Sequence, residues 1–282
     1  MRGICFVFQT RNPKSESATA IPHSSMSSLR IVTYNIAHGR GLRPFSALSS
    51  QRRIRAQLNK IAKLLSTFKA DVVALQEIDQ DSSWSGHFDH LEYLRRFARF
   101  PYAVFGVNTR RDGLFHFNYG NAFLSRHPIM DSENIAFGKK TLGEKGFLFM
   151  EIDVGGKRVP IVNMHLHHRS RAHRIKQVGL LMDYLTKKSC EARPEWAMRP
   201  IVCGDLNNPS HTADATRSLF QFFSQYGCYR LFPLNEKTYP SPLPQRTLDF
   251  VFLPPNCTEA SCRVVKSFLS DHRPVVVDCK LT

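Results

Sequence analysis

The sequence has few acidic residues and no long apolar run. Its 282 residues include 23 aspartates and glutamates against 39 lysines and arginines, so the formal net charge is +16. This balance favours polyanionic partners such as nucleic acid, anionic lipid or phosphorylated metabolites, although a basic surface can also serve solubility alone. No apolar stretch approaches the roughly 20 residues that a membrane-spanning helix needs. We therefore expect a protein without a transmembrane segment.

Signatures of disulfide, zinc and serine-nucleophile chemistry are also absent. The seven cysteines are scattered, odd in number and without a CxxC pair, which is typical of reduced thiols rather than of a disulfide framework. Cys257 and Cys262 alone offer too few ligands for a structural zinc ion. The chain has no GxSxG motif, which argues against a serine nucleophile on a strand-to-helix elbow. These features predict a cytoplasmic protein, and no obligate protein partner is evident.

The first 28 residues differ in composition from the rest of the chain. Residues 9–29 are polar, rich in serine and poor in large apolar side chains, which predicts a disordered leader over residues 1–28. The chain as a whole is 42% hydrophobic, which is enough to bury a substantial core. We therefore expect one globular domain over residues 29–282, without repeats or an internal linker.

Beyond the leader, short apolar runs typical of strands alternate with stretches of helical periodicity. Apolar residues from Ile54 to Phe68 recur at spacings of three and four, which predicts an amphipathic helix over residues 51–68. Further helices are expected over residues 87–98, 171–188 and 212–224. Strands are expected over residues 29–36, 71–78, 101–107, 119–125, 132–137, 200–204, 247–253, 261–268 and 274–279, and residues 147–168 are expected to form a hairpin turned at Gly155 and Gly156. This mixture predicts an α/β protein.

Polar residues stand in or beside these strands with unusual regularity. They are Asn35, Glu77, Asn121, His165, Asp205, Asp249, Asp271 and His272. One such residue alone is most often an ordinary turn or cap residue. If the strand ends meet at one edge of a sheet sandwich, however, four carboxylates and two histidines converge there. Such a cluster is costly unless a metal ion or a charged substrate compensates it.

The residue types favour a hard cation. Magnesium is usually held by one or two carboxylates with water and substrate phosphate, which fits Glu77 assisted by Asn35. A zinc site would instead use His165, His167 and His168. Alternation along a strand, however, would place His165 and His167 on one face and His168 on the other. We therefore favour magnesium over zinc.

Seven motifs occur in order along the chain: "TYNI", "LQEI", "GNAFLSRHPI", "NMHLHH", "GDLNNP", "TLDFVF" and "SDHRPV". With them the chain resembles the endonuclease/exonuclease/phosphatase superfamily, from about Leu29 to Leu281. The GDxN and SDHxP patterns are the most specific of the seven. The resemblance implies a DNase I-like fold, a four-layered α/β/β/α sandwich of two mixed β-sheets.

The resemblance also implies roles for the residues in these motifs. Glu77, aided by Asn35 and supported by Asp271, would hold Mg²⁺, with Mn²⁺ as a substitute. His272, oriented by Asp249, would contact the scissile phosphate or activate water. Asp205 would activate or orient the water or protonate the leaving oxygen, and Asn207 would donate a hydrogen bond to the phosphate. His165 completes the expected catalytic set, and Asn121 and Arg174 the expected substrate contacts.

Further residues bear on the substrate. A histidine at position 165 is similar to DNase I, sphingomyelinases and several phosphatases, whereas apurinic endonucleases of the exonuclease III type have a tyrosine there. Arg169, Arg171, Arg174 and Lys176, extended by Arg110 and Arg111, form either a phosphate-steering patch or a solvated surface. Trp84, Phe115 and Phe117 either pack their loops or contact bases or lipid.

We therefore expect a magnesium-dependent phosphodiesterase or endonuclease that acts on nucleic acid. The alternatives are a sphingomyelinase-like phosphodiesterase of a lipid head group and a phosphatase of a small phosphoester. A non-catalytic nucleic-acid-binding module is a remote alternative, because such a module would lack a metal carboxylate or the histidine of the SDH motif.

Overall fold

Twelve strands form two six-stranded sheets in the computed structural model, which describes residues 27–43, 50–139, 143–191, 198–209 and 211–282. The first sheet has the order β11 (Cys257–Val264), β12 (Val275–Leu281), β1 (Ser27–Asn35), β2 (Val72–Asp79), β4 (Phe117–Ser125) and β3 (Tyr102–Arg111). The second has the order β5 (Ile129–Ala136), β6 (Gly146–Val154), β7 (Lys157–His165), β8 (Ile201–Asp205), β10 (Asp249–Leu253) and β9 (Arg230–Phe232). Both are mixed, because β1 and β2 are parallel, as are β7 and β8, while the other pairs are antiparallel.

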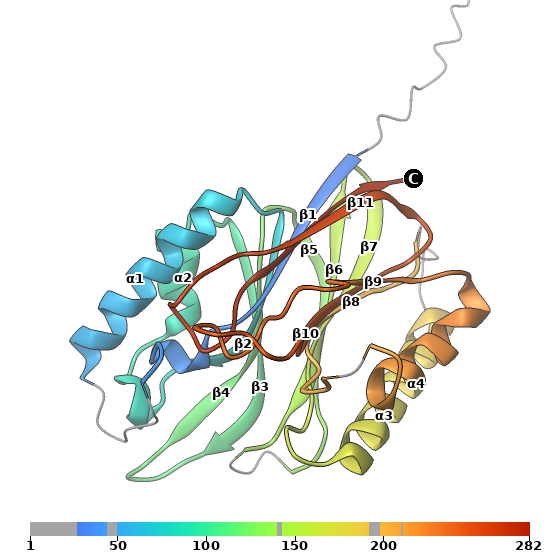
Figure 1. The fold of residues 1–282 in the computed structure, drawn as a ribbon. Coiled ribbons are helices and arrows are strands. Elements are labelled where there is room, and N and C mark those ends of the chain that lie inside the picture. Colours follow the sequence, from blue (N-terminus) through green and yellow to red (C-terminus); the bar gives the residue numbers. More distant parts are fainter. Residues whose placement is uncertain (1–26, 44–49, 140–142, 192–197, 210) are drawn as a thin grey trace, which may run out of the picture.

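Four helices cover the outer faces of the two sheets. They are α1 (Gln51–Phe68), α2 (His90–Phe97), α3 (Arg171–Glu191) and α4 (Asp214–Phe223). Figure 1 shows α1 and α2 on one side of the molecule and α3 and α4 on the other, with the sheets between them. Short 3-10 turns occur at Ala37–Gly39, Ser83–Ser85 and Ser224–Tyr226. The four-layered α/β/β/α sandwich expected from the sequence is confirmed.

Three apolar clusters hold the layers together. The central one joins the inner faces of the two sheets, for example through Ile31 and Met150. A second packs α1 and α2 on the first sheet, and a third packs α3 and α4 on the second sheet. Within α1 the predicted apolar stripe from Ile54 to Phe68 is buried, and full burial of one such side chain is worth about 1.5–3 kcal/mol. No helix in the described ranges is long and apolar enough to cross a membrane.

The chain departs from the predicted elements at a few points. Residues 1–26 of the predicted leader lie outside the described residues, but Ser27 and Ser28, also assigned to it, belong to β1 and pair with β12. The hairpin turns at Gly155 and Gly156 as predicted, yet β7 ends at His165. Strand β9 has only three residues and was not predicted, because so short a run has no readable periodicity.

Strand register places the polar motif residues in two rows. In the first sheet Asn35 on β1 is opposite Gln76 on β2, which is opposite Asn121 on β4. In the second sheet the row runs from His165 on β7 through Asp205 on β8 to Asp249 on β10. The two rows belong to the two packed sheets, and they meet where Asn35 Nδ2 donates to Asp205 Oδ2.

Candidate active site

A cavity of about 430 Å³ lies between the ends of the two polar rows. Seven residues singled out from the sequence line it: Asn35, Glu77, His165, Asp205, Asn207, Asp271 and His272. Asp249 is fully buried behind His272. The structure therefore brings together eight of the ten residues predicted for the site, from both sheets.

Glu77 reaches the cavity because β2 carries a bulge. The register between β2 and β4 shifts between Gln76 and Ile78, and Glu77 has a φ of 52°. A bulge re-aims a side chain, and a left-handed φ at a residue other than glycine is uncommon. Burial alone would raise the pKa of the Glu77 carboxyl, but the positive charge of Lys145 and the neighbouring histidines hold it well below its usual range. Glu77 is thus an ionised carboxylate that is only partly exposed.

Asp205 is almost fully buried and accepts two hydrogen bonds. Its Oδ2 lies 3.0 Å from Asn35 Nδ2, and its Oδ1 lies 2.8 Å from the backbone nitrogen of Asn207. The imidazole Nε2 atoms of His165 and His272 lie 3.5 and 3.7 Å from Oδ2. Burial raises the pKa of the Asp205 carboxyl, and His272 opposes the rise. Asp205 therefore faces two imidazoles from inside the wall of the cavity.

Gly204 explains why a glycine precedes this aspartate. Its φ is +135°, and a Cβ built on it would lie 1.9 Å from the backbone oxygen of Met164 on β7. A side chain at position 204 would therefore push β8 away from the strand that carries His165. The glycine allows the close parallel pairing that sets Asp205 opposite His165.

His272 is held by a buried carboxylate. Its Nδ1 lies 2.9 Å from Asp249 Oδ2, which leaves Nε2 facing Asp205 and the cavity. Burial alone would lower the pKa of His272, but the charges of Asp249 and Asp205 raise it above its ordinary value. The ring of Tyr239 lies 4.9 Å from the imidazole, centroid to centroid. This is the carboxylate–histidine arrangement that fixes ring orientation and tautomer.

His165 differs from His272 in its charge. Its pKa lies well below the ordinary value, because the ring is buried and lies beside Lys145. Lys145 Nζ is 3.4 Å from His165 Nδ1 and 3.4 Å from Glu77 Oε1. Of the two imidazoles that face Asp205, His165 is thus favoured in its neutral form and His272 in its cationic form.

Asn207 and Asp271 already have partners within the protein. Asn207 has a φ of 48°, and its Nδ2 donates to the backbone oxygen of Leu166 at 2.9 Å. The second hydrogen of that amide remains available to a ligand. Asp271 Oδ2 lies 2.8 Å from Arg40 Nη2, so this carboxylate holds a guanidinium at the cavity.

Two residues that were predicted to contact the substrate do not line the cavity. Asn121 is fully buried and donates to the backbone oxygens of Gly146 and Asn163, which ties the two sheets together. Arg174 forms a buried ion pair with Asp214 and donates to the backbone oxygen of His167. Arg174 thus links α3 and α4 through a carboxylate 40 residues away that was not apparent as a motif, and its expected substrate contact stays a prediction.

The geometry of the "HLHH" segment also differs from the prediction. Because β7 ends at His165, strand alternation does not continue through the next residues. His168 lines the cavity with His165. His167 instead lines a neighbouring hollow, and its Nδ1 accepts from the backbone nitrogens of Arg169 and Ser170.

Four polar or charged residues that line the cavity were missed in the sequence. They are Arg40, Lys145, Tyr239 and Arg246. They lie outside the seven motifs, and three of them are cationic. Only the general excess of basic residues pointed toward them.

Aromatic residues near the site mainly pack its wall. Trp84 contacts the rings of His38, Phe117 and Tyr119, and its Nε1 donates to Asp79 at 2.7 Å. His38 in turn lies 2.8 Å from Asp79 and 3.5 Å from Glu77. For Trp84 and Phe117 the packing interpretation is supported, whereas Phe115 is exposed.

The oxygen donors fit a divalent cation. Glu77 offers an ionised carboxylate at the cavity. The amide oxygen of Asn35 accepts from the backbone nitrogen of Ala37 at 3.0 Å and retains a second lone pair. Asp205, Asp249 and His272 also offer ligand atoms within 4.8 Å of one another, but these atoms already serve the contacts described above.

Comparisons with known proteins agree with this fold. The model of the Endonuclease/Exonuclease/phosphatase family matches residues 32–272. The uncharacterized protein YbhP of Escherichia coli (strain K12) is 24% identical over 271 residues, which cover 90% of this chain and 97% of YbhP.

Two solved structures show how varied the similar proteins are. Sphingomyelinase C from Streptomyces griseocarneus is 22% identical with a TM-score of 0.63, and the match covers 91% of this chain and all of that chain. A mannosyl-6-phosphatase from Bacteroides thetaiotaomicron VPI-5482 is 14% identical with a TM-score of 0.63, over 89% of this chain and 99% of that chain. At these identities the similarity concerns the fold and does not select a substrate.

Proposed function

Because the chain belongs to the Endonuclease/Exonuclease/phosphatase family, we propose that it is a magnesium-dependent phosphodiesterase that cleaves nucleic acid. The observation that carries the proposal is the cationic rim of the cavity. Arg40, Lys145 and Arg246 line the same cavity as Asp205 and His272. A polyanionic backbone would contact these cations while one phosphodiester meets the catalytic groups.

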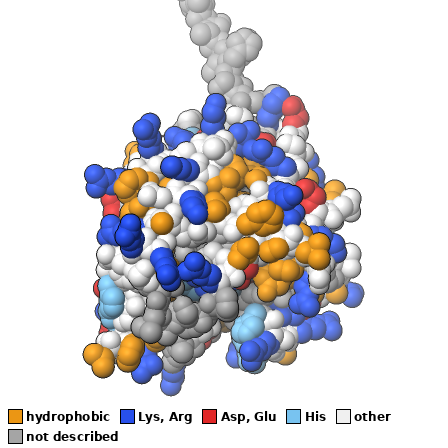
Figure 2. Space-filling view, turned by 60° about the vertical axis from the view of Figure 1, so that its left-hand side comes forward, with side chains coloured by type: hydrophobic (Ala, Val, Ile, Leu, Met, Phe, Trp, Pro, Cys, Tyr) orange, Lys and Arg blue, Asp and Glu red, His pale blue; other side chains and the backbone are white. Residues whose placement is uncertain are grey.

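The charge of the protein surface also supports a polyanionic substrate. Figure 2 shows Lys and Arg side chains spread over one face of the molecule with few acidic side chains among them. The net charge of +16 also favours a polyanionic substrate. Such a field raises the association rate of a polyanion and makes binding fall steeply with salt.

In the proposed reaction His272 contacts the scissile phosphate through Nε2, since Asp249 occupies Nδ1. Asp205 orients or activates the attacking water and is itself positioned by Asn35 and Asn207. The remaining amide hydrogen of Asn207 donates to a phosphate oxygen. Neutral His165 offers a further hydrogen bond without adding charge. Such groups act by stabilising charge that develops in the transition state.

Glu77, with Asn35, would hold the magnesium ion. When bound, the ion supplies charge neutralisation at the phosphate and the leaving oxygen. Lys145, 3.4 Å from Glu77, keeps this carboxylate ionised. Mn²⁺ would act as a substitute, because it also prefers oxygen ligands.

Nicking of supercoiled plasmid at low salt tests the proposal. We expect nicking with magnesium, none with EDTA, and none by the Asp205→Asn variant. An Asp112→Asn variant serves as control, because Asp112 is exposed on a loop. Parallel assays use sphingomyelin and p-nitrophenyl phosphate. Turnover of either, by folded enzyme that leaves plasmid and RNA intact, would replace the nucleic-acid proposal with a lipid or small-phosphoester substrate.

We also propose a cytoplasmic location. Five cysteines in the described part of the chain are free thiols, namely Cys203, Cys228, Cys257, Cys262 and Cys279, as expected of a protein from a reducing compartment. Fractionation of cells that produce the tagged protein tests this, and recovery in a secreted fraction would contradict it.

A further inference from the structure

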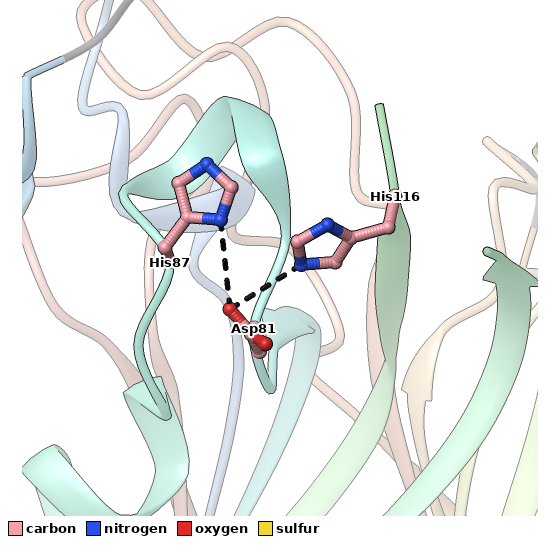
Figure 3. A group of neighbouring side chains, drawn as sticks. All are labelled: Asp81, His87 and His116. Atoms are coloured by element: carbon pink, nitrogen blue, oxygen red, sulfur yellow. Dashed lines mark ion pairs between the residues drawn. The ribbon is translucent and has the colours of Figure 1, made fainter. Parts of the chain in front are cut away.

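A second group of metal-binding side chains lies outside the catalytic cavity. Asp81, His87 and His116 each offer one ligand atom, and these atoms lie within 4.8 Å of one another. Figure 3 shows the Asp81 carboxylate between the two imidazole rings. None of the three lines the catalytic cavity, and the proposed reaction does not use them.

We propose that Asp81, His87 and His116 form a binding site for Zn²⁺ or a similar borderline divalent transition metal. Two imidazoles and one carboxylate are a donor set typical of zinc, with water completing the tetrahedron. Hard cations such as magnesium prefer an all-oxygen set. The site is therefore chemically distinct from the oxygen-rich catalytic site.

The distances suit a small cation with little adjustment. Ligands about 2.0–2.1 Å from a tetrahedral zinc ion lie about 3.3–3.4 Å apart. His116 Nε2 is 3.4 Å from Asp81 Oδ1, and His87 Nδ1 is 3.8 Å from the same oxygen. The two rings are 5.0 Å apart, centroid to centroid. The exposed side chains of Asp81 and His87, each 57% accessible, can make the remaining movement.

The contacts of His116 hold its ring in an orientation that suits metal binding. Its Nδ1 lies 3.2 Å from Ser83 Oγ, and Ser83 Oγ also accepts from the backbone nitrogen of His116. An Nδ1–H bond to the hydroxyl leaves the lone pair on Nε2, as in metal sites where an outer partner fixes the tautomer. Nε2 is buried and has no hydrogen-bond partner among the described residues. A metal ion would satisfy this atom.

The site would link two loops that are distant in sequence. Asp81 and His87 flank the short turn Ser83–Ser85, and His116 immediately precedes β4. The backbone nitrogen of Ser83 already donates to the backbone oxygen of His116 at 2.9 Å. An ion bound to the native fold alone would stabilise this junction by mass action.

Zinc titration of the full chain without a polyhistidine tag tests the proposal. Excess magnesium is present, and a chromophoric chelator competes for zinc. We expect His87→Ala and His116→Ala each to abolish the binding of one zinc ion, or to weaken its affinity by at least about 10–100-fold. A loss of that size is typical even when the mutated residue only contacts a metal ligand. Ser83→Ala should weaken the same equivalent without removing it.

His127→Ala is the matched control, because His127 lies 3.7 Å from Asp71 in a pair that has no third metal-binding side chain beside it among the residues the structure describes. This variant should bind zinc as the original protein does. Cobalt absorption gives an independent readout, since the visible bands of the site should disappear in His87→Ala. Circular dichroism checks folding, and His87→Ala decides the question alone if His116→Ala does not fold. Equal zinc stoichiometry and affinity in the original protein and in His87→Ala would overturn the proposal.

Discussion

Asp249 lies behind His272, with its Oδ2 2.9 Å from the imidazole Nδ1. The opposite ring nitrogen faces Asp205 at 3.7 Å. One buried carboxylate thus fixes the ring, and a second carboxylate faces its other nitrogen. This relationship leaves Nε2 as the nitrogen of His272 that faces the cavity.

Asp249→Asn should lower kcat strongly while leaving the fold intact. The amide removes the negative charge that stabilises the imidazolium and can favour the wrong tautomer, a change that costs about 10⁴-fold in a serine protease. We expect a loss of about 10²–10⁴-fold in plasmid nicking, with KM little changed. A kcat within threefold of the original value would show that Asp249 does not position His272.

Lys145→Ala should reduce both activity and its salt dependence. Lys145 contacts Glu77 and His165 at the cavity wall. Loss of one phosphate-contacting lysine should lower the slope of log binding constant against log salt concentration by about 1. Lys187→Ala is the control, because Lys187 is an exposed residue of α3. Identical slopes for the two variants would remove Lys145 from the proposed substrate contacts.

Arg174→Met should destabilise the protein rather than impair catalysis. The ion pair with Asp214 is buried on both sides, and removing one partner of such a pair costs about 3–5 kcal/mol. Urea unfolding should show this loss, and Arg174→Met combined with Asp214→Asn should recover part of it. A stable variant with a raised KM would instead restore the substrate role predicted from the sequence.

Gly204→Ala should be more damaging than Gly113→Ala. Both glycines have a left-handed φ, but a Cβ at Gly113 meets nothing within 4 Å, whereas one at Gly204 overlaps a backbone oxygen of β7. Backbone strain alone costs about 1–3 kcal/mol, and overpacking adds about 1–3 kcal/mol. Thermal unfolding of the two variants separates these effects. Equal Tm losses would show that the contact between β7 and β8 is not limiting.

The sequence predicted which residues line the cavity wherever a polar residue follows an apolar, strand-like run. Residues such as Asn35, His165 and Asp205 follow apolar runs, and strand pairing brings them to one cavity. Glu77 was predicted as a metal ligand from its residue type and its place near a strand end. The bulge that turns its side chain toward the cavity, however, has no sequence marker. The burial of Arg174 could not be predicted, because it depends on Asp214, a tertiary partner. Lys145 and Arg246 lie outside the motifs, so only the folded chain reveals their position.

Strand β12 pairs with β1 on one side and β11 on the other. The first sheet is therefore complete only when segments from opposite ends of the described chain pair with each other. Pairing over such a separation must overcome a large loop entropy and is expected to be slow. His272 lies three residues before the start of β12, whereas Asn35 ends β1. A fragment that stops before residue 270 would keep Glu77 and Asp205 but lack both His272 and a central strand. The proposed activity should thus be absent from a chain that stops before residue 270.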